Sequence, residues 1–206
     1  RHLVGIAARD VLGHTPEVDV IGRDLTTVAE AALEVALADL DPRVPFAVLA
    51  LGRFGGAELS YASDLDVVFV HGGTGPSAVE EARRLATGLR RSLHGATPSD
   101  RLYEIDAGLR PEGRDGPLSR SVAGDHALGE ELLAVVEPFV WGPGLDARAE
   151  TEIRRMKARL ETERIPAGED ARFHLKLGKG SLSDIEWTAQ LLQLRHGVRA
   201  PGTWAA

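Results

Sequence analysis

The chain has 206 residues, of which 43% are hydrophobic, so it is long and apolar enough to form a packed core. Its formal net charge of -7 argues against binding nucleic acid through excess positive charge, and the absence of cysteine excludes a disulfide framework or a thiolate zinc site. The sequence shows no signal peptide and no apolar run of the roughly 20 residues that cross a membrane, so we expect a cytoplasmic protein without nucleic-acid or membrane partners.

The first 52 residues predict two helices and a strand. Apolar residues at helical spacing indicate a helix over residues 1–12. A second helix is predicted over 23–41, with Asp24 or Thr26 as its N-terminal cap. The apolar run 45–52 ends at a glycine and is typical of a short buried strand.

The next 60 residues or so add a turn, two strands and a helix. A glycine turn with a short helical piece covers 53–60, and the valine-rich run 64–72 predicts a second strand. Residues 77–95 predict a helix capped by Ser77, with a glutamate in the capping-box position three residues later. Alternating residues in 101–111 predict a half-buried strand. This order predicts an α+β fold with a mixed sheet.

Beyond Gly124 the sequence predicts helices with no convincing strand between them, so we expect a domain boundary there. Residues 1–124 would form the α+β domain, with helices in 1–44, and residues 125–206 a helical domain truncated at its C-terminus. The chain begins at Arg1 rather than at a methionine, so we expect a fragment of a longer protein. The later helices are predicted over 127–141, 147–164 and 181–197.

Three aspartates form the strongest candidate site. Asp64 and Asp66 are two residues apart in a strand, so their side chains point to one face, with Cα atoms about 6.6 Å apart. Alone, such a pair is more typical of solvated acids at an exposed strand edge. Asp106 supplies a third carboxylate on a later strand. Carboxylates on neighbouring strands suit Mg²⁺ and a two-metal phosphoryl or nucleotidyl transfer site, where Asp106 could also accept the proton of an attacking hydroxyl.

A glycine-rich turn precedes the paired aspartates. Gly55 and Gly56 would allow the backbone to approach a phosphate closely, between a strand and a helix start. Taken alone, the two glycines are more simply explained by a tight connection. Together with the three aspartates they indicate a site for a phosphate-bearing substrate.

Three segments in family order resemble the bacterial glutamine synthetase adenylyltransferases, which belong to the DNA polymerase β-like nucleotidyltransferase superfamily. The segments are ALGRFGGAELSYASDLDVVFV, LYEIDAGLRPEG and FHLKLGKGSLSDIEWTAQLLQLRHG. The resemblance implies a DNA polymerase β-like domain followed by a helical domain. It also implies Mg²⁺-dependent transfer of AMP from ATP to a tyrosine of glutamine synthetase, regulating nitrogen assimilation, with a PII-type signalling protein as a further partner of the full-length protein.

The resemblance also assigns roles to individual residues. Asp64, Asp66 and Asp106 would be catalytic and would bind two Mg²⁺ ions. The nucleotide would be bound by Gly55, Gly56, Ser63, Arg110, Lys176 and Lys179. Simpler explanations remain open: Ser63 could be a cap, Arg110 could pair with a surface acid, and the lysines could be solvated. We expect His71, directly after the predicted strand core, to be a loop histidine.

The family enzyme carries two similar units, one attaching and one removing AMP. The segments SYASDLD, LYEIDA and SDIEW resemble the attaching unit more closely than the removing unit. The alternatives are the removing unit, in which phosphate attacks, and a catalytically silent nucleotide-binding regulatory module. The chain departs from the family pattern at Gly108, where arginine is common, and at Ser181, where glycine is usual. It also lacks a segment with basic residues that we expect directly after Gly124.

Overall fold

The fold is given by a computed structural model that divides into two compact units, Arg1–Ala134 and Val135–Ala206. The predicted boundary near Gly124 lies outside the described residues. The structure describes residues 1–14, 17–61, 63–97, 100–108, 116–121, 134, 136–138, 140–142, 144–163, 165, 168, 170, 174, 176–200 and 203.

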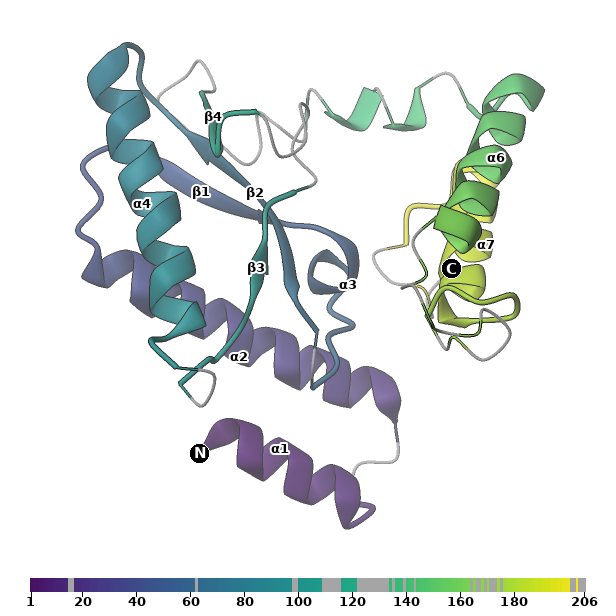
Figure 1. Ribbon diagram of the computed structural model, residues 1–206, viewed down its shortest axis with the longest axis horizontal. Helices are drawn as coiled ribbons and strands as arrows, with labels where there is room; N and C mark the ends of the chain where they lie inside the picture. The colour runs from purple at the N-terminus through teal and green to yellow at the C-terminus, as the bar shows by residue number, and fades with distance from the viewer. Residues whose placement is uncertain are drawn as a thin grey trace. The chain divides into compact units, whose positions relative to one another are not determined.

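The first unit combines a small mixed sheet with helices, as the sequence predicts (Figure 1). None of the helices in the described ranges is both long and apolar enough to cross a bilayer. The elements of this unit are α1 (His2–Val11), α2 (Val18–Asp39), β1 (Phe46–Ala50), α3 (Gly52–Gly55), β2 (Leu65–His71), α4 (Pro76–His94), β3 (Ile105–Asp106) and β4 (Ser119–Ser121).

Strand β2 is the centre of the sheet. β1 runs antiparallel along residues 67–71 of β2. On the opposite edge, β3 pairs in parallel with Leu65 and Asp66, and β4 pairs in parallel with residues 69–71. The two short parallel strands therefore follow one another along β2, and β3 lies beside its first residues.

The alternation of β2 places the core on one face of the sheet. Leu65, Val67 and Phe69 are at most 1% exposed and belong to a cluster with apolar residues of α2 and α4. Both helices therefore cover the same face of the sheet (Figure 1). Asp66 and Val68 alternate with these residues and are only half-buried. Because successive side chains of a strand point to opposite faces, Asp66 points away from α2 and α4.

The start of α2 differs from the prediction. The helix begins at Val18 rather than near residue 23, so Asp24 and Thr26 lie in its interior and cap nothing. Asp24 instead forms an ion pair with Arg9 of α1, and the Thr26 hydroxyl donates to the Gly22 carbonyl at 2.8 Å. Tertiary packing of the apolar face has extended the helix past the residues that usually stop one.

The start of α4 also differs from the prediction. Pro76 occupies the first turn, where its fixed φ suits a helix and its missing N–H costs nothing. Gly75 is therefore the N-cap, and Ser77 lies inside the helix without a capping hydrogen bond. Glu80 pairs with Arg83 at 2.8 Å instead of closing a capping box.

The parallel edge of the sheet was the hardest part to predict. β3 contains only two residues of the predicted strand 101–111. β4 was not predicted, because its sequence, Ser-Arg-Ser, has neither β-branched nor apolar residues. It forms through pairing with the last residues of β2 rather than through its own propensity.

The expectation that His71 is a loop histidine was wrong. His71 is the last residue of β2 and is 1% exposed. Its Nδ1 lies 2.8 Å from the Ser119 hydroxyl of β4, and its buried Nε2 has no hydrogen-bond partner among the described residues. Burial lowers the pKa of the His71 imidazole below its ordinary value.

The buried imidazole predicts a pH-dependent stability. Below about pH 6.5 the unfolded chain binds a proton at His71 before the folded chain does, so the free energy of unfolding should fall as pH decreases. The slope should reach at most about 1.4 kcal/mol per pH unit. Urea unfolding between about pH 7.5 and pH 5.5 measures it. His71→Asn should lose this component, whereas His14→Gln, which changes an exposed histidine, should keep it. Equal pH dependence in His71→Asn and the wild type would contradict the prediction.

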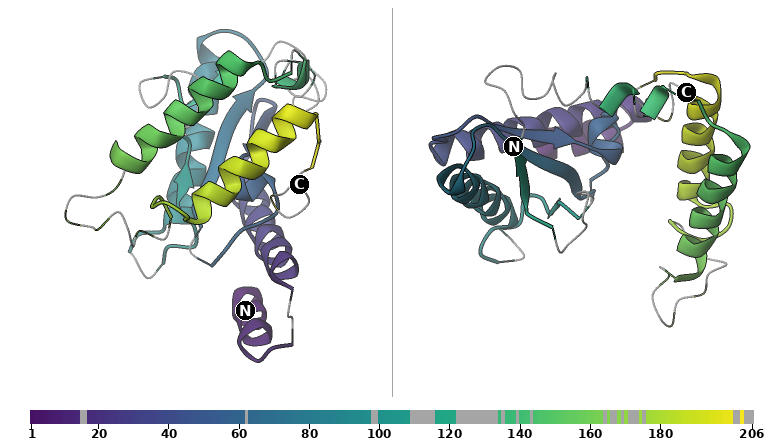
Figure 2. Two further views of the ribbon diagram at one scale, coloured as in Figure 1. Left: turned by 90° about the vertical axis from the view of Figure 1, so that its right-hand side faces the viewer. Right: turned by 90° about the horizontal axis from the view of Figure 1, so that it is seen from above.

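The second unit contains an antiparallel pair of helices, α6 (Ala147–Glu163) and α7 (Leu182–His196). Figure 2 shows them side by side. Lys157 of α6 pairs with Asp184 at the start of α7, and Glu150 of α6 lies 3.5 Å from Arg195 near its end. These helices confirm the predictions over 147–164 and 181–197. Most of the predicted helix 127–141 lies outside the described residues.

Candidate functional site

The three predicted carboxylates lie around the start of β2. Asp64 is exposed directly before the strand, Asp66 is half-buried within it, and Asp106 is exposed on β3. In the parallel pairing, Asp66 is directly opposite Asp106, as Leu65 is opposite Ile105. Paired residues of neighbouring strands share a face, so Asp66 and Asp106 lie on the face opposite the core.

Asp64 and Asp106 share a cavity of about 430 Å³. Among the residues that the structure describes, two further charged side chains line this cavity: Arg90 of α4 and Glu104, which precedes β3. Asp66 is not among the described residues that line the cavity, which are Asp64, Arg90, Glu104, Ile105, Asp106, Ala107 and Gly108. The structure therefore brings two of the three predicted carboxylates to one cavity and places the third beside it on the strand.

The carboxylate of Asp66 lies against Gly52, a residue that the sequence interpretation missed. A Cβ on Gly52 would lie 2.7 Å from Asp66 Oδ2, and Gly52 has φ +53°. The backbone conformation favours glycine here, and a larger residue would have to displace the Asp66 carboxylate. The Leu51 N–H donates to the Asp66 carbonyl at 2.8 Å, which ties the start of α3 to β2. Gly52 is the first glycine of the L-G-R-F-G-G run, and its place directly after a strand was the available signal.

Gly55 and Gly56 close the short helix α3. Their N–H groups donate to the carbonyls of Leu51 and Gly52, at 2.9 and 3.0 Å. A Cβ on Gly55 would lie 2.6 Å from the Ala50 carbonyl oxygen, so this glycine allows a close backbone contact. Binding of a phosphate by these two N–H groups would replace the observed hydrogen bonds and remains a prediction.

Ser63 helps to shape the loop before Asp64. Its Oγ accepts a hydrogen bond from the Ser60 N–H at 3.0 Å, and the two hydroxyls lie 2.9 Å apart. The Tyr61 hydroxyl donates to Asp10 of α1 at 2.9 Å. These contacts fix the loop that carries Asp64, so α1 and Ser60 contribute to the site through this loop. Contact between Ser63 and a phosphate remains a prediction.

A backbone hydrogen bond holds the Asp106 carboxylate. The Gly108 N–H donates to Asp106 Oδ1 at 2.7 Å, and a Cβ on Gly108 would lie 2.8 Å from the same oxygen. Glycine therefore fits closely where the family pattern commonly has arginine. Arg110 follows two residues later and lies outside the described residues.

The carboxylates of Asp64, Asp66 and Asp106 are oxygen donors of the kind that magnesium prefers. Within the described ranges, no group of three or more His, Cys, Asp or Glu side chains is arranged to hold a metal ion. Mg²⁺ usually takes one or two protein carboxylates together with substrate phosphates and water, rather than a cage made only of protein. Asp64 and Asp106, facing one open cavity, fit that requirement.

Lys176 and Lys179 are exposed in the loop before α7, in the second unit. The loop is well fixed: the Ser181 hydroxyl donates to the Lys176 carbonyl at 2.8 Å, and the Leu177 N–H donates to His174 Nδ1 at 2.9 Å. The sequence departs from the usual glycine at Ser181, which is buried here as the N-cap of α7. Nucleotide binding by the two lysines remains a prediction.

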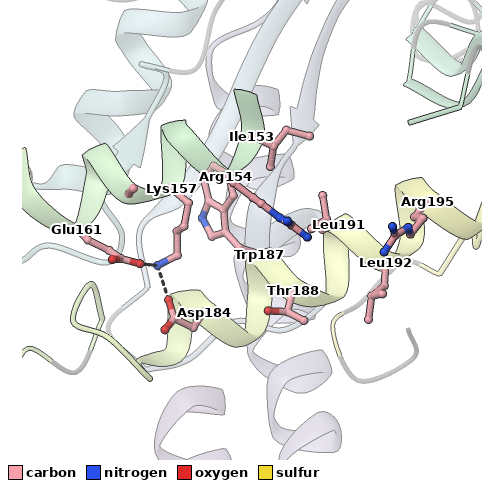
Figure 3. Close-up of a pocket in the computed structure, with 11 residues that line it drawn as sticks. Ile153, Arg154, Lys157, Glu161, Asp184, Trp187, Thr188, Leu191, Leu192 and Arg195 are labelled. Carbon is pink, nitrogen blue, oxygen red and sulfur yellow. Dashed lines mark hydrogen bonds and ion pairs between the residues drawn. The ribbon is translucent and has the colours of Figure 1, made fainter. Parts of the chain in front are cut away.

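Asp184 joins the two helices of the second unit (Figure 3). Asp184 pairs with Lys157, whose Nζ also lies 2.8 Å from Glu161 Oε1. The Asp184 carboxylate accepts a hydrogen bond from the Gly180 N–H at 2.5 Å. The Lys157 ammonium holds the pKa of the Asp184 carboxyl below its ordinary value. These residues border a cavity of about 500 Å³, with Trp187 between the helices. In this structure Asp184 lies in the first turn of α7, where a carboxylate favours the helix N-terminus, and it also pairs with Lys157 of α6.

Residues 1–128 match the family model described as glutamate-ammonia ligase adenylyltransferase. The chain is also similar to curated proteins named bifunctional glutamine synthetase adenylyltransferase/adenylyl-removing enzyme. It is 42% identical to the protein of Cutibacterium acnes over 233 residues, covering 98% of this chain and 23% of the relative. It is 42% identical to the protein of Mycobacterium tuberculosis over 242 residues, covering 98% of this chain and 24% of the relative.

The chain thus spans about a quarter of the length of the curated relatives that it matches. The aligned regions, 233 and 242 residues long, exceed the 206 residues of the chain, so these relatives carry additional residues within the matched region. This agrees with the segment that we expected after Gly124, although its position remains a prediction. The family model alone covers more than half of the chain. The chain therefore belongs to the glutamate-ammonia ligase adenylyltransferase family.

Proposed function

We propose that the first unit is a DNA polymerase β-like nucleotidyltransferase domain that transfers AMP from ATP to a tyrosine of glutamine synthetase. One observation carries the proposal: Asp64 and Asp106 face one cavity, and Asp66 lies beside it, paired with Asp106 across the parallel strands. The names of the relatives supply the substrate, since they act on glutamine synthetase.

The reaction needs a positioned hydroxyl and a proton acceptor. The tyrosine oxygen forms a bond to the α-phosphorus of ATP while the bond from that phosphorus to the pyrophosphate oxygen breaks. Asp106 takes the proton of the hydroxyl, and the Gly108 N–H keeps its carboxylate oriented. Gly52 and Gly55 let the backbone of α3 pass close to the Asp66 carboxylate of β2 and to the Ala50 carbonyl of β1. Most of the catalysis would then be positioning and neutralisation of charge.

Asp64, Asp66 and Asp106 are the residues that would hold Mg²⁺, and two ions are expected. When bound, the ions neutralise charge on the phosphates of the nucleotide and on the departing pyrophosphate. Arg110, Lys176, Lys179 and Ser63 are proposed to contact the nucleotide. The same proposal includes a cytoplasmic location and a PII-type signalling protein as a partner of the full-length enzyme.

The second candidate is phosphorolysis, in which phosphate attacks the AMP on modified glutamine synthetase and releases ADP and the free tyrosine. It would use the same carboxylates, and the names of the relatives include both activities. The words SYASDLD and SDIEW favour attachment. A silent nucleotide-binding module is the third candidate, and the three carboxylates in and beside one cavity disfavour it.

Two assays with the purified chain separate these functions. The first incubates unmodified glutamine synthetase with Mg²⁺ and ATP labelled at the α-phosphate. The second incubates adenylylated glutamine synthetase with inorganic phosphate. We expect incorporation of label in the first assay and little release of ADP in the second. The opposite pattern would assign the chain to AMP removal, and turnover in neither assay would support the silent module.

A further inference from the structure

Arg90 of α4 contributes a cation to the wall of the carboxylate cavity. Arg90 belongs to a helix, whereas Asp64 directly precedes β2 and Asp106 lies in β3. Two earlier arginines of α4 are held in ion pairs: Arg83 with Glu80 at 2.8 Å and Arg84 with Glu81 at 2.7 Å. Among the residues that the structure describes, Arg90 makes no comparable ion pair or hydrogen bond.

None of the three described acids of the cavity forms an ion pair with the Arg90 guanidinium. Glu104 is already paired, at 3.0 Å, with Arg101, which does not line the cavity. Within the described part of the chain, Asp64 and Asp106 lie on the same cavity as Arg90 without an ion pair to it. In the described ranges the Arg90 guanidinium is thus unpaired and shares the cavity with the carboxylates of Asp64, Glu104 and Asp106.

The position of Arg90 indicates which part of the ligand it meets. In the proposed reaction the α-phosphorus lies near Asp64 and Asp106, and Arg90 of α4 lines the same cavity as these two carboxylates. Arginine binds phosphate oxygens in a bidentate manner and stays protonated at all physiological pH values. The β- and γ-phosphates are the anionic part of ATP that would otherwise lie in an acidic cavity.

We propose that Arg90 is a positioning residue that binds the β- and γ-phosphates of ATP and orients the departing pyrophosphate. This inference rests on the proposed function, because it assumes that the cavity binds a nucleoside triphosphate. It assigns the role to a helix residue that lies outside the three family motifs. Arg91, the next residue of α4, is also exposed but does not line the cavity, so it provides a matched control.

The test measures nucleotide binding and turnover separately. Calorimetry with the purified chain and Mg²⁺ gives the Kd of ATP and of AMP for the wild type, Arg90→Ala, Arg90→Lys and Arg91→Ala. Arg90→Ala should weaken ATP binding about 10- to 100-fold while changing AMP binding less than about threefold, because AMP lacks the β- and γ-phosphates. Arg90→Lys should restore part of the loss, and Arg91→Ala should match the wild type. In the transfer assay, Arg90→Ala should raise the KM for ATP by a similar factor.

Other outcomes would overturn the inference. Wild-type ATP affinity in Arg90→Ala would do so, as would equal weakening of ATP and AMP or an equal effect of Arg91→Ala. Thermal melting of each variant, which should match the wild type because Arg90 is exposed, separates lost binding from lost folding. If the wild type binds ATP but transfers no AMP to glutamine synthetase, the proposed function fails, and the difference between Arg90→Ala and Arg91→Ala in ATP binding still decides the role of Arg90.

Discussion

Asp64→Asn is expected to reduce AMP transfer to glutamine synthetase by at least about a hundredfold, because it removes one of the carboxylates proposed to hold Mg²⁺ at the α-phosphate. Asparagine has nearly the same shape as aspartate, so a lower transfer rate would reflect the lost charge and metal binding rather than a change in side-chain volume. Asp64 is exposed and lies outside β2, so the fold should be unaffected. The initial rate of label transfer from ATP and the melting temperature of the variant measure the two expectations.

Asp39→Asn is the matched control for this prediction. It makes the same chemical change at an exposed position of α2 that does not line the cavity. Its transfer rate should stay within about twofold of the wild type. Retained transfer in Asp64→Asn, or an equal loss in Asp39→Asn, would show that the carboxylate at position 64 is not part of the catalytic site.

Leu65→Ala is expected to lower the free energy of unfolding of the first unit by about 2–5 kcal/mol. Leu65 is 0% exposed and lies in the core cluster with residues of α2 and α4. Truncation removes apolar contacts and leaves a cavity directly behind the strand residues beside Asp64 and Asp66. Urea unfolding followed by circular dichroism measures the change in stability.

Leu102→Ala serves as the comparison for Leu65→Ala. Leu102 is 46% exposed shortly before β3, so the same truncation should cost less than about 1 kcal/mol there. The difference between the two variants isolates the contribution of burial in β2. A loss below about 1 kcal/mol in Leu65→Ala would contradict the assignment of Leu65 to the core.

Most elements of the fold could be predicted because their local signals agree with the tertiary structure. The valine-rich run of β2 indicates a strand at nearly the right bounds, and the helix predicted over 77–95 matches α4, although its cap is Gly75 rather than Ser77. Prediction failed where pairing or packing outweighed local preference. β4 forms from Ser119–Ser121 only because β2 offers backbone groups for pairing beside it. α2 begins at Val18, five residues before its predicted start.

The sequence pointed to the three carboxylates, whose roles remain predictions, but not to the residues that support them. The D-x-D spacing predicts that Asp64 and Asp66 point to one face of a strand, but β2 begins at Leu65, and only Asp64 of the two lines the cavity. The contact between Gly52 and the Asp66 carboxylate depends on how the start of α3 is held against β2, which is a tertiary contact rather than a local sequence signal. Arg90 was also missed, because its place on the cavity wall depends on how α4 packs against β3.

The most direct test of the proposed function is mass-spectrometric mapping of glutamine synthetase after incubation with ATP, Mg²⁺ and the purified chain. We predict AMP on a tyrosine of glutamine synthetase with the wild type and none with Asp64→Asn, while both proteins show the same melting temperature. Unmodified glutamine synthetase after incubation with the correctly folded wild type, or equal modification by Asp64→Asn, would contradict the proposal that these carboxylates form an AMP-transferring site.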